Sequence, residues 1–437
     1  MKMKKLFYYS MLMFAVMTAI TSCSDDDKND PVKQIKQTKV GLEMTIPQEL
    51  SGVTQLKDIQ VKFYNVTTGR DVTFNQKDVE FELEGGKLKT TYRLDSVKVA
   101  EGLYNIDLDG TIVYADTKKP TGKLHATAMN LNLVPSAAGI DPSAKLEGFL
   151  ANVSNGFVIS EICVSGPLTP KGKQYIGDAY FRITNNSDET LYADGLFIAE
   201  SEFNQMLQQD YKPDVRSTYM PIDYLTRVPG THGVDKKYPV KPGESILICD
   251  NAINHKDEDH NPNSWDLSKA NFEWYDESTN PAFTDIDNPN VENTIRLFTT
   301  SLTIWIPHNR GFKSYAIGFL TVDDNTFKTK EEYKYDYSYT FVSGSFKREM
   351  NFNAMKIPNT WIIDAVNLAI KDQKKWDLIS PSLDYGYTWV CEVDRDKNRY
   401  GKAVRRKFNA TTKKLQDTNN SEYDFETVKA DPFHVFK

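Results

Sequence analysis

Apolar and polar residues alternate one by one in many short runs along this chain, and this pattern constrains the fold more than any other feature. Clear examples are the runs at 39–46, 59–66 and 333–341. Successive side chains of a strand point to opposite faces, so each run predicts a strand with one buried face. The chain also has 23 Tyr and 23 Phe, which fit pleated, half-buried surfaces. The sequence therefore predicts an all-β fold.

Length and charge narrow the class of protein. The 437 residues are 40% hydrophobic and 26% charged, which is a globular composition that predicts two or three domains. A formal net charge of −7 argues against a protein that binds the phosphate backbone of nucleic acids, so we expect no nucleic-acid partner. Six His and four Cys leave little room for zinc or thiol chemistry.

The N-terminus has the layout of an export signal. A basic start precedes an apolar stretch at 11–20, which is too short to span a bilayer. It ends in Ile20-Thr21-Ser22-Cys23, which resembles the lipobox cut by the lipoprotein signal peptidase. The resemblance implies that residues 1–22 are a lipoprotein signal peptide and that Cys23 is the acylated lipid anchor. The alternative is an ordinary secretory signal with a chance Cys.

An acidic segment follows the predicted anchor. Residues 23–36 lack the apolar content of a packed element, and we expect a disordered tether there. Its start, Ser24-Asp25-Asp26-Asp27, resembles the surface-export signal of Bacteroidota lipoproteins. That resemblance implies a protein that is lipid-anchored in the outer membrane and exposed at the cell surface. The periplasmic face is the alternative.

Residues 37–133 form the first predicted domain. Three of its segments, taken in order, resemble those of transthyretin-like or carboxypeptidase-regulatory-type modules. They are Val61-Lys62-Phe63-Tyr64-Asn65, Thr68-Gly69 and Glu101-Gly102-Leu103-Tyr104. The resemblance implies a small β-sandwich. Small and turn-forming residues after it predict a linker at 134–154.

The second predicted domain covers residues 155–437. Its segments resemble, in order, those of the lamin-tail domain, an immunoglobulin-like β-sandwich. They are Ile159-Ser160-Glu161, Asn185-Asn186-Ser187, Gly195, Pro242-Gly243-Glu244, Trp361-Ile362-Ile363-Asp364-Ala365-Val366, Arg405-Arg406, Asp417-Thr418-Asn419-Asn420-Ser421 and Asp424-Phe425. The late arrival of the closing segments implies an insertion at about 250–355, which we expect to have strands of its own. The whole resembles an uncharacterised Bacteroidota lipoprotein family found near TonB-dependent receptors.

Two patterns suggest a recognition surface. The run at 333–341 places Tyr333, Tyr335, Tyr337 and Tyr339 on one strand face, which is a candidate aromatic ligand platform. The alternative is a buried face of a sandwich strand, which the alternation also predicts. All six Trp lie beyond residue 250, so we expect a recognition surface in the insertion or the C-terminal part.

No pattern identifies a catalytic or metal site. The chain has no G-x-S-x-G and no H-E-x-x-H, so no catalytic residue and no cofactor is assigned. The polar run from Asp250 to His260 matches no metal-ligand spacing, and a solvated loop is the preferred interpretation. Asp285-Ile286-Asp287-Asn288-Pro289 begins like a calcium loop but lacks the required Gly.

Three cysteines remain after the predicted lipidation, and each lies in an apolar, strand-like run. An odd number could mean one bridge and one free thiol, but buried free cysteines are the preferred interpretation. The three are Cys163, Cys249 and Cys391.

Together these features predict a lipid-anchored, non-enzymatic binding or accessory protein. It would capture an extracellular ligand for, or dock onto, a TonB-dependent transporter of the outer membrane. The alternatives are a hydrolase with carboxylates in the insertion, and an adhesin or envelope scaffold. A shallow aromatic groove would favour capture, whereas carboxylates or histidines converging in a deep cleft would favour the hydrolase.

Overall fold

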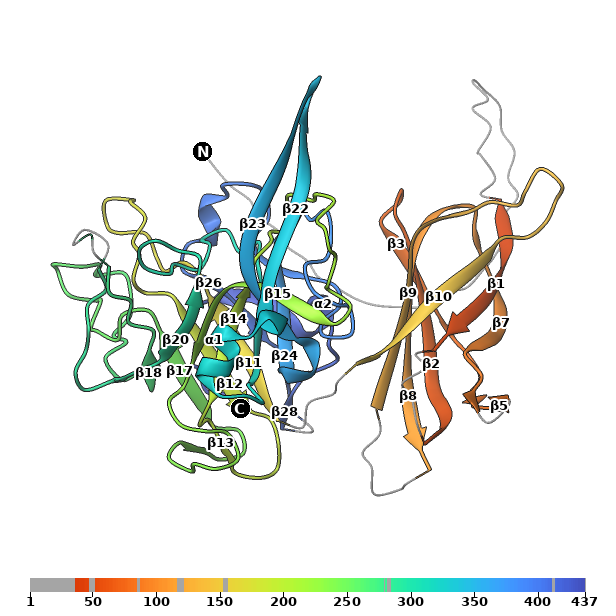
Figure 1. Cartoon of the computed structure of the whole chain (residues 1–437). Helices are drawn as coiled ribbons and strands as arrows, with labels where there is room; N and C mark the ends of the chain where they lie inside the picture. Colours follow the sequence, from red (N-terminus) through yellow and green to blue (C-terminus); the bar gives the residue numbers. More distant parts are fainter. Residues whose placement is uncertain are drawn as a thin grey trace, which may run out of the picture.

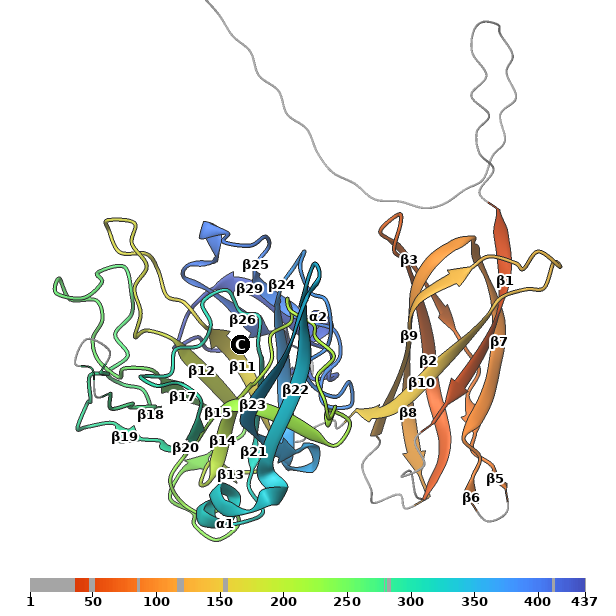
Figure 2. The same ribbon diagram turned by 45° about the horizontal axis from the view of Figure 1, so that its top comes forward.

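The computed structural model describes residues 36–46, 52–84, 87–115, 122–151, 156–278, 280, 284–410 and 413–436. It is nearly all β, as the alternating pattern predicted. The elements form two bodies that lie side by side, one from the first third of the chain and one from the rest (Figures 1 and 2).

The first body is one eight-stranded sheet that curves around its own apolar core. Its order is β3 (Arg70–Asn75), β2 (Val53–Asn65), β8 (Gly102–Tyr114), β9 (Gly122–Leu133), β10 (Ser143–Ala151), β1 (Gln37–Thr45) and β7 (Thr91–Ala100), with β4 (Val79–Glu80) on β2. The alternation works as predicted, since Val40, Leu42 and Met44 of β1 all point into this core. A small hairpin, β5 (Leu83–Glu84) and β6 (Lys87–Leu88), is separate from this sheet.

The linker predicted at 134–154 is wrong in its second half. Residues Ser143–Ala151 form β10, which pairs parallel with β1 and antiparallel with β9. Ala144 and Leu146 are buried in the first core. Turn residues at 135–142 mark only the connection between β9 and β10, so the first domain extends to residue 151.

The second body is a sandwich of two sheets. One sheet has the order β19 (Glu292–Asn293), β18 (Phe272–Glu273), β17 (Ser245–Cys249), β12 (Tyr180–Asn185), β11 (Phe157–Cys163), β26 (Lys402–Arg406) and β29 (Phe425–Lys429). The other has the order β22 (Lys334–Ser343), β23 (Phe346–Pro358), β15 (Tyr219–Arg227), β14 (Leu196–Ser201), β21 (Ser314–Phe319), β24 (Ile362–Ile370) and β25 (Thr388–Cys391), with β20 (Ile295–Thr299) on β15. The main core lies between the two sheets.

Short elements cover the edges of this sandwich. Two further strand pairs are β13 (Leu191–Tyr192) with β16 (Pro239–Val240), and β27 (Phe408–Asn409) with β28 (Lys414–Leu415). Helix α1 (Asp324–Thr329) begins where the Asp323 side chain accepts a hydrogen bond from the Thr326 N–H, and α2 (Ser421–Asp424) begins similarly at Asn420. Single 3₁₀ turns lie at Glu331–Tyr333, Asn359–Trp361 and Lys397–Arg399.

The sheet that contains β14 is buried on both faces. A second apolar cluster on its outer face joins Phe197 and Ala199 of β14 to Phe327 of α1 and to Trp376. All six residues of β14 are consequently buried. The stretch 250–355 does have strands, as predicted, but β20 to β23 join this same sheet instead of forming a separate module.

Candidate functional site

The predicted lipid anchor and export signal cannot be placed in the fold. Cys23 and Ser24, Asp25, Asp26 and Asp27 lie outside the described residues. They therefore remain predictions from the sequence.

The tyrosine run of β22 is mostly core. Tyr333, Tyr335 and Tyr337 are 4%, 2% and 7% exposed, and Tyr339 is only partly buried. The Tyr335 hydroxyl donates to the Pro213 carbonyl oxygen at 2.7 Å. Three of the four rings therefore offer no open platform, because the outer-face core covers them; the buried-strand interpretation describes them correctly.

An open cleft of about 470 Å³ lies beside this run, and we call it the aromatic cleft. The connection between β14 and β15 supplies most of its wall, and β22 and the segment after β24 supply the rest. Its lining residues are Phe203, Gln208, Gln209, Asp210, Tyr211, Asp214, Arg216, Thr340 and Trp376.

Three stacked rings form the apolar part of the aromatic cleft. Phe203 and Trp376 are buried, at 5% and 7% exposed, and Tyr211 is half-buried. Tyr211 stacks on Phe203 with ring centroids 4.0 Å apart and on Trp376 at 5.4 Å. It also meets the edge of Tyr339 at 5.3 Å. The Trp376 indole N–H donates to the Asn204 carbonyl oxygen at 2.9 Å, which fixes the orientation of that ring. The rings are thus held in place before any ligand arrives.

Charged and amide groups form the rim of the aromatic cleft. Asp214 accepts two hydrogen bonds from Arg216, at 2.9 and 2.6 Å, and this pairing lowers the pKa of Asp214. The Arg216 guanidinium also lies 4.7 Å from the centre of the Trp376 ring. Gln208 and Asp210 are exposed at the mouth. A carboxylate whose pKa is lowered is a poor general acid, so this rim suits binding better than acid–base chemistry.

A cluster of carboxylates lies buried near the cleft. Burial raises the pKa values of Glu200, Glu202 and Asp223, despite the nearby ammonium of Lys313. Lys313 donates to Asp223 at 2.6 Å and to the Ser201 and Glu202 carbonyl oxygens at 2.7 and 2.9 Å.

The buried cluster is connected to the tyrosine run but not to an open cleft. The Tyr337 hydroxyl donates to Glu202 at 2.6 Å. The three protons of the Lys313 ammonium all have acceptors within hydrogen-bond distance. None of the four residues lines a cleft described in this part of the chain. This arrangement fits a structural cation better than a catalytic one.

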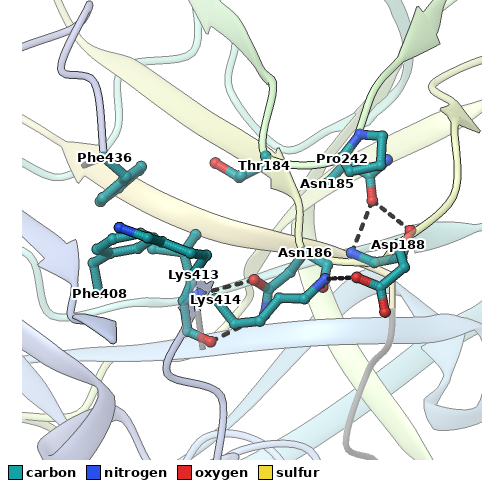
Figure 3. Close-up of a pocket in the computed structure, with 12 residues that line it drawn as sticks. Thr184, Asn185, Asn186, Asp188, Pro242, Phe408, Lys413, Lys414 and Phe436 are labelled. Carbon is teal, nitrogen blue, oxygen red and sulfur yellow. Dashed lines mark hydrogen bonds and ion pairs between the residues drawn. The ribbon is translucent and has the colours of Figure 1, made fainter. Parts of the chain in front are cut away.

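A second pocket, of about 450 Å³, lies near the C-terminus (Figure 3). The Asn186 side chain donates to the Leu415 carbonyl oxygen at 3.0 Å and accepts from its N–H at 2.8 Å. Lys414 pairs with Asp188 at 2.7 Å and donates to the Asn186 carbonyl oxygen at 3.0 Å (Figure 3). Phe408 and Phe436 stack at 5.8 Å. Most polar groups here join the β27–β28 pair to the turn after β12, so we rank this pocket below the aromatic cleft.

A third cleft, of about 680 Å³, lies beside α1. His232 stacks on Phe319 at 3.5 Å, and burial lowers the pKa of His232. Arg227 donates two hydrogen bonds to Asp324, at 2.9 and 2.7 Å, and two more to backbone carbonyl oxygens. Because the Arg227 guanidinium is already paired in this way, it is not free to bind a ligand in this cleft.

The polar run from Asp250 to His260 is exposed at Asn254 and at residues 256–259, as expected of a solvated loop, but buried at its start and at His255. His255 is fully buried, between the Tyr175 hydroxyl and the Asn251 carbonyl oxygen, each at 2.8 Å. Burial lowers the pKa of His255 to about 4. Within the described ranges, no group of three or more His, Cys, Asp or Glu side chains is arranged to hold a metal ion.

The predicted buried free thiols are confirmed. All three described cysteines are buried and unbridged, and burial raises their pKa values. They are Cys163, Cys249 and Cys391.

Sequence reasoning missed most of the aromatic cleft. Phe203 and Tyr211 lie in an irregular stretch with no periodic pattern, and only Thr340 and Trp376 of the lining residues lie within the predicted recognition region. The single available signal was the density of aromatics around 203–211, which is too weak to stand alone.

The comparisons found one family model that is similar to part of the second body. The model of a family described as "Protein of unknown function (DUF4876)" matches residues 241–431. A crystal structure of a DUF4876 family protein from Bacteroides thetaiotaomicron is 23% identical, covers 89% of this chain and 94% of its own, and superposes with a TM-score of 0.51. No curated protein matches the chain. The similarity to the solved structure supports the fold.

A second solved structure shares little with the chain. It is a leucine-rich repeat protein from Bacteroides thetaiotaomicron, 10% identical over 74% of this chain and 24% of its own, with a TM-score of 0.18. No helix in the described ranges is long and apolar enough to cross a membrane.

Proposed function

We propose that this chain is a lipid-anchored, non-enzymatic binding protein of the outer membrane whose ligand enters the aromatic cleft. The observation that carries the proposal is an open cleft with amide and carboxylate groups on its rim. Its wall includes the half-buried ring of Tyr211, which the buried rings of Phe203 and Trp376 hold in place. Such a surface suits a ligand with a flat apolar face and a polar edge, of which a pyranose ring is an example.

The electrostatics favour binding over hydrolysis. Glu200, Glu202 and Asp223, whose pKa values burial raises, line none of the clefts described above. Asp214, which lines the aromatic cleft, has a lowered pKa. A glycoside hydrolase needs one carboxylic acid with a raised pKa beside the bond that breaks. An envelope scaffold would not need an open cleft.

The binding test replaces the central ring of the cleft. Tyr211→Ala removes the ring that stacks on Phe203 and Trp376, and calorimetry against a panel of oligosaccharides measures the effect. We expect at least about tenfold weaker binding, because well-packed aromatic contacts dominate such affinities. Tyr64→Ala is the matched control, since Tyr64 is 40% exposed and belongs to the first body. Equal binding by Tyr211→Ala and the unsubstituted protein would contradict the proposal.

The location rests on the lipobox resemblance at Cys23 and the acidic run at Asp25, Asp26 and Asp27. Cys23→Ala should release the protein from membranes, and replacing the three Asp with Ala should reduce surface labelling by antibody. For the partner, we infer a TonB-dependent transporter. Mild-detergent extracts of outer membranes should yield such a barrel together with this protein, and its absence would count against the partnership.

A further inference from the structure

The hairpin of β22 and β23 carries the apolar face of the tyrosine run beyond the body of the protein. Burial along β22 is high at Tyr335 and Tyr337 and ends after Tyr339. The four residues from Thr340 to Ser343 extend about 13 Å at the usual rise of a strand. Figure 1 shows the hairpin tip standing clear of the sandwich.

The tip exposes large apolar side chains on both faces of the hairpin. Phe341 and Phe346 are 40% and 56% exposed on one face, and Val342 is 55% exposed on the other. Phe352 continues the first face toward the body, where it stacks on Tyr339 at 5.8 Å. A protein that docked flat against one face would leave the other face in water. A surface that receives the tip end-on covers both faces.

Basic residues surround the apolar tip. Lys347 pairs across the hairpin with Val342, and Arg348 pairs with Phe341, and both are exposed. The two strands carry four basic and two acidic residues, in a chain whose formal net charge is −7. These residues are Lys334, Lys347, Arg348 and Lys356 against Asp336 and Glu349. An apolar tip with flanking cations is complementary to an anionic lipid surface.

The position of the hairpin in the molecule agrees with a contact between its tip and a lipid surface. In both views, the hairpin tip and the beginning of β1 lie toward the same end of the molecule (Figures 1 and 2). The segment with the predicted anchor leads into β1, and only 13 residues separate Cys23 from Gln37. A membrane that held the anchor would therefore lie on the side toward which the tip points.

We propose that the tip of the β22–β23 hairpin inserts Phe341, Val342 and Phe346 into an anionic lipid surface, with Lys347 and Arg348 at the headgroups. The hairpin is a second contact beside the acyl anchor and orients the aromatic cleft at its base. The contact is independent of the cleft's ligand, so the two proposals can fail separately.

The test measures lipid binding without the anchor. Protein that begins at Ser24 retains every described residue and is sedimented with vesicles of phosphatidylglycerol and phosphatidylcholine, or of phosphatidylcholine alone. We expect binding to the anionic vesicles that weakens with salt. The double variant Val342→Ser/Phe346→Ser should bind at least about tenfold more weakly. The double variant Lys347→Gln/Arg348→Gln should bind about thirtyfold more weakly at low salt.

The control variant tests whether an exposed apolar side chain outside the tip contributes to vesicle binding. Leu302 is 96% exposed and distant in sequence from the hairpin, so Leu302→Ser should leave vesicle binding unchanged. Unchanged thermal unfolding of all variants would show that the exposed substitutions do not affect folding. Absence of binding to anionic vesicles, or equal binding by the tip variant, overturns the proposal. A dimer that the tip variant abolishes would identify a second copy of the chain as the occupant and would also overturn it.

Discussion

The buried guanidinium of Arg406 should hold the second body together. It is 1% exposed, lies on β26, and donates to both carboxylate oxygens of Asp364 at 2.8 and 2.7 Å. It also reaches Asp417 at 3.1 Å and Asp424 at 3.3 Å. Its Nε donates to the Ile159 carbonyl oxygen at 2.9 Å. One cation thus joins β26, β24, β11 and the segment around α2.

Replacing this cation should be costly. Arg406→Gln leaves three carboxylates buried without a counterion, and breaking a buried charge network in this way costs about 3–5 kcal/mol. Arg348→Gln is the matched control, because Arg348 is exposed and should change stability by less than about 0.5 kcal/mol. Urea unfolding at pH 7, followed by Trp fluorescence, reports on the second body, since all six Trp belong to it.

The pH dependence gives a second readout for Arg406→Gln. Burial already raises the pKa of Asp364, and burial together with nearby carboxylates raises that of Asp417 to about 7, although Arg406 opposes both shifts. Without Arg406 these pKa values rise further. A folded-state pKa above the unfolded value favours the native state below the unfolded pKa, near 4, and that advantage is lost as the pH rises through the folded pKa. The loss of stability should therefore be smaller at pH 5 than at pH 7. A loss below about 1 kcal/mol at pH 7, or one that is equal at both pH values, would refute the reasoning.

Three further predictions test other parts of the structure. His125 contacts the Asp109 carboxylate in its own body and lies 2.7 Å from the Thr418 carbonyl oxygen of the other body. Burial opposes its charge, but the hydrogen bond to Asp109 and the negative charge of Asp109, together with the Thr418 carbonyl oxygen and Asp424, outweigh burial and raise the pKa of His125. The contact between bodies should therefore hold at low pH and loosen as the pH rises through that pKa, which X-ray scattering would show as a larger radius of gyration. Gly318→Ala should destabilise the protein by about 1–3 kcal/mol in urea unfolding, because the new Cβ would lie 2.0 Å from the Trp361 carbonyl oxygen. Three thiols should react with Ellman's reagent only after unfolding; these are Cys163, Cys249 and Cys391.

The alternating pattern predicted strands well because it is a local property. In β1 every second residue from Thr38 to Met44 is buried, and the sequence alone shows that period. Pairing between distant strands is not local. The partner of β10 is β1, about 100 residues earlier, and neither strand contains a signal for the other. The small residues at 134–142 therefore predict a linker, although the chain returns to the same sheet after them.

The aromatic cleft shows the same limit for a binding site. Phe203 and Tyr211 come from the connection after β14, Thr340 comes from β22, and Trp376 follows β24. These segments meet only because β22, β23, β15, β14, β21 and β24 lie in that order in one sheet. A rule based on residue spacing in the sequence cannot predict that order of strands. The tyrosine run lies beside the aromatic cleft, but most of its own rings are in the core.

The segments that carry the lamin-tail resemblance explain why similarity identifies a fold more readily than a function here. The buried network around Arg406 consists of residues from these segments. They are Arg406 itself, Asp364 from the Trp361–Val366 segment, and Asp417 and Asp424 from the closing segment. Each is nearly inaccessible to a ligand, since none is more than 4% exposed in its side chain. Loss of any one leaves a buried charge or donor unpaired, so the fold restricts these positions strongly. The rim of the aromatic cleft is under no such restriction from folding, because Gln208 and Asp210 are exposed. A sequence that shares the network can therefore share the sandwich and still bind a different ligand.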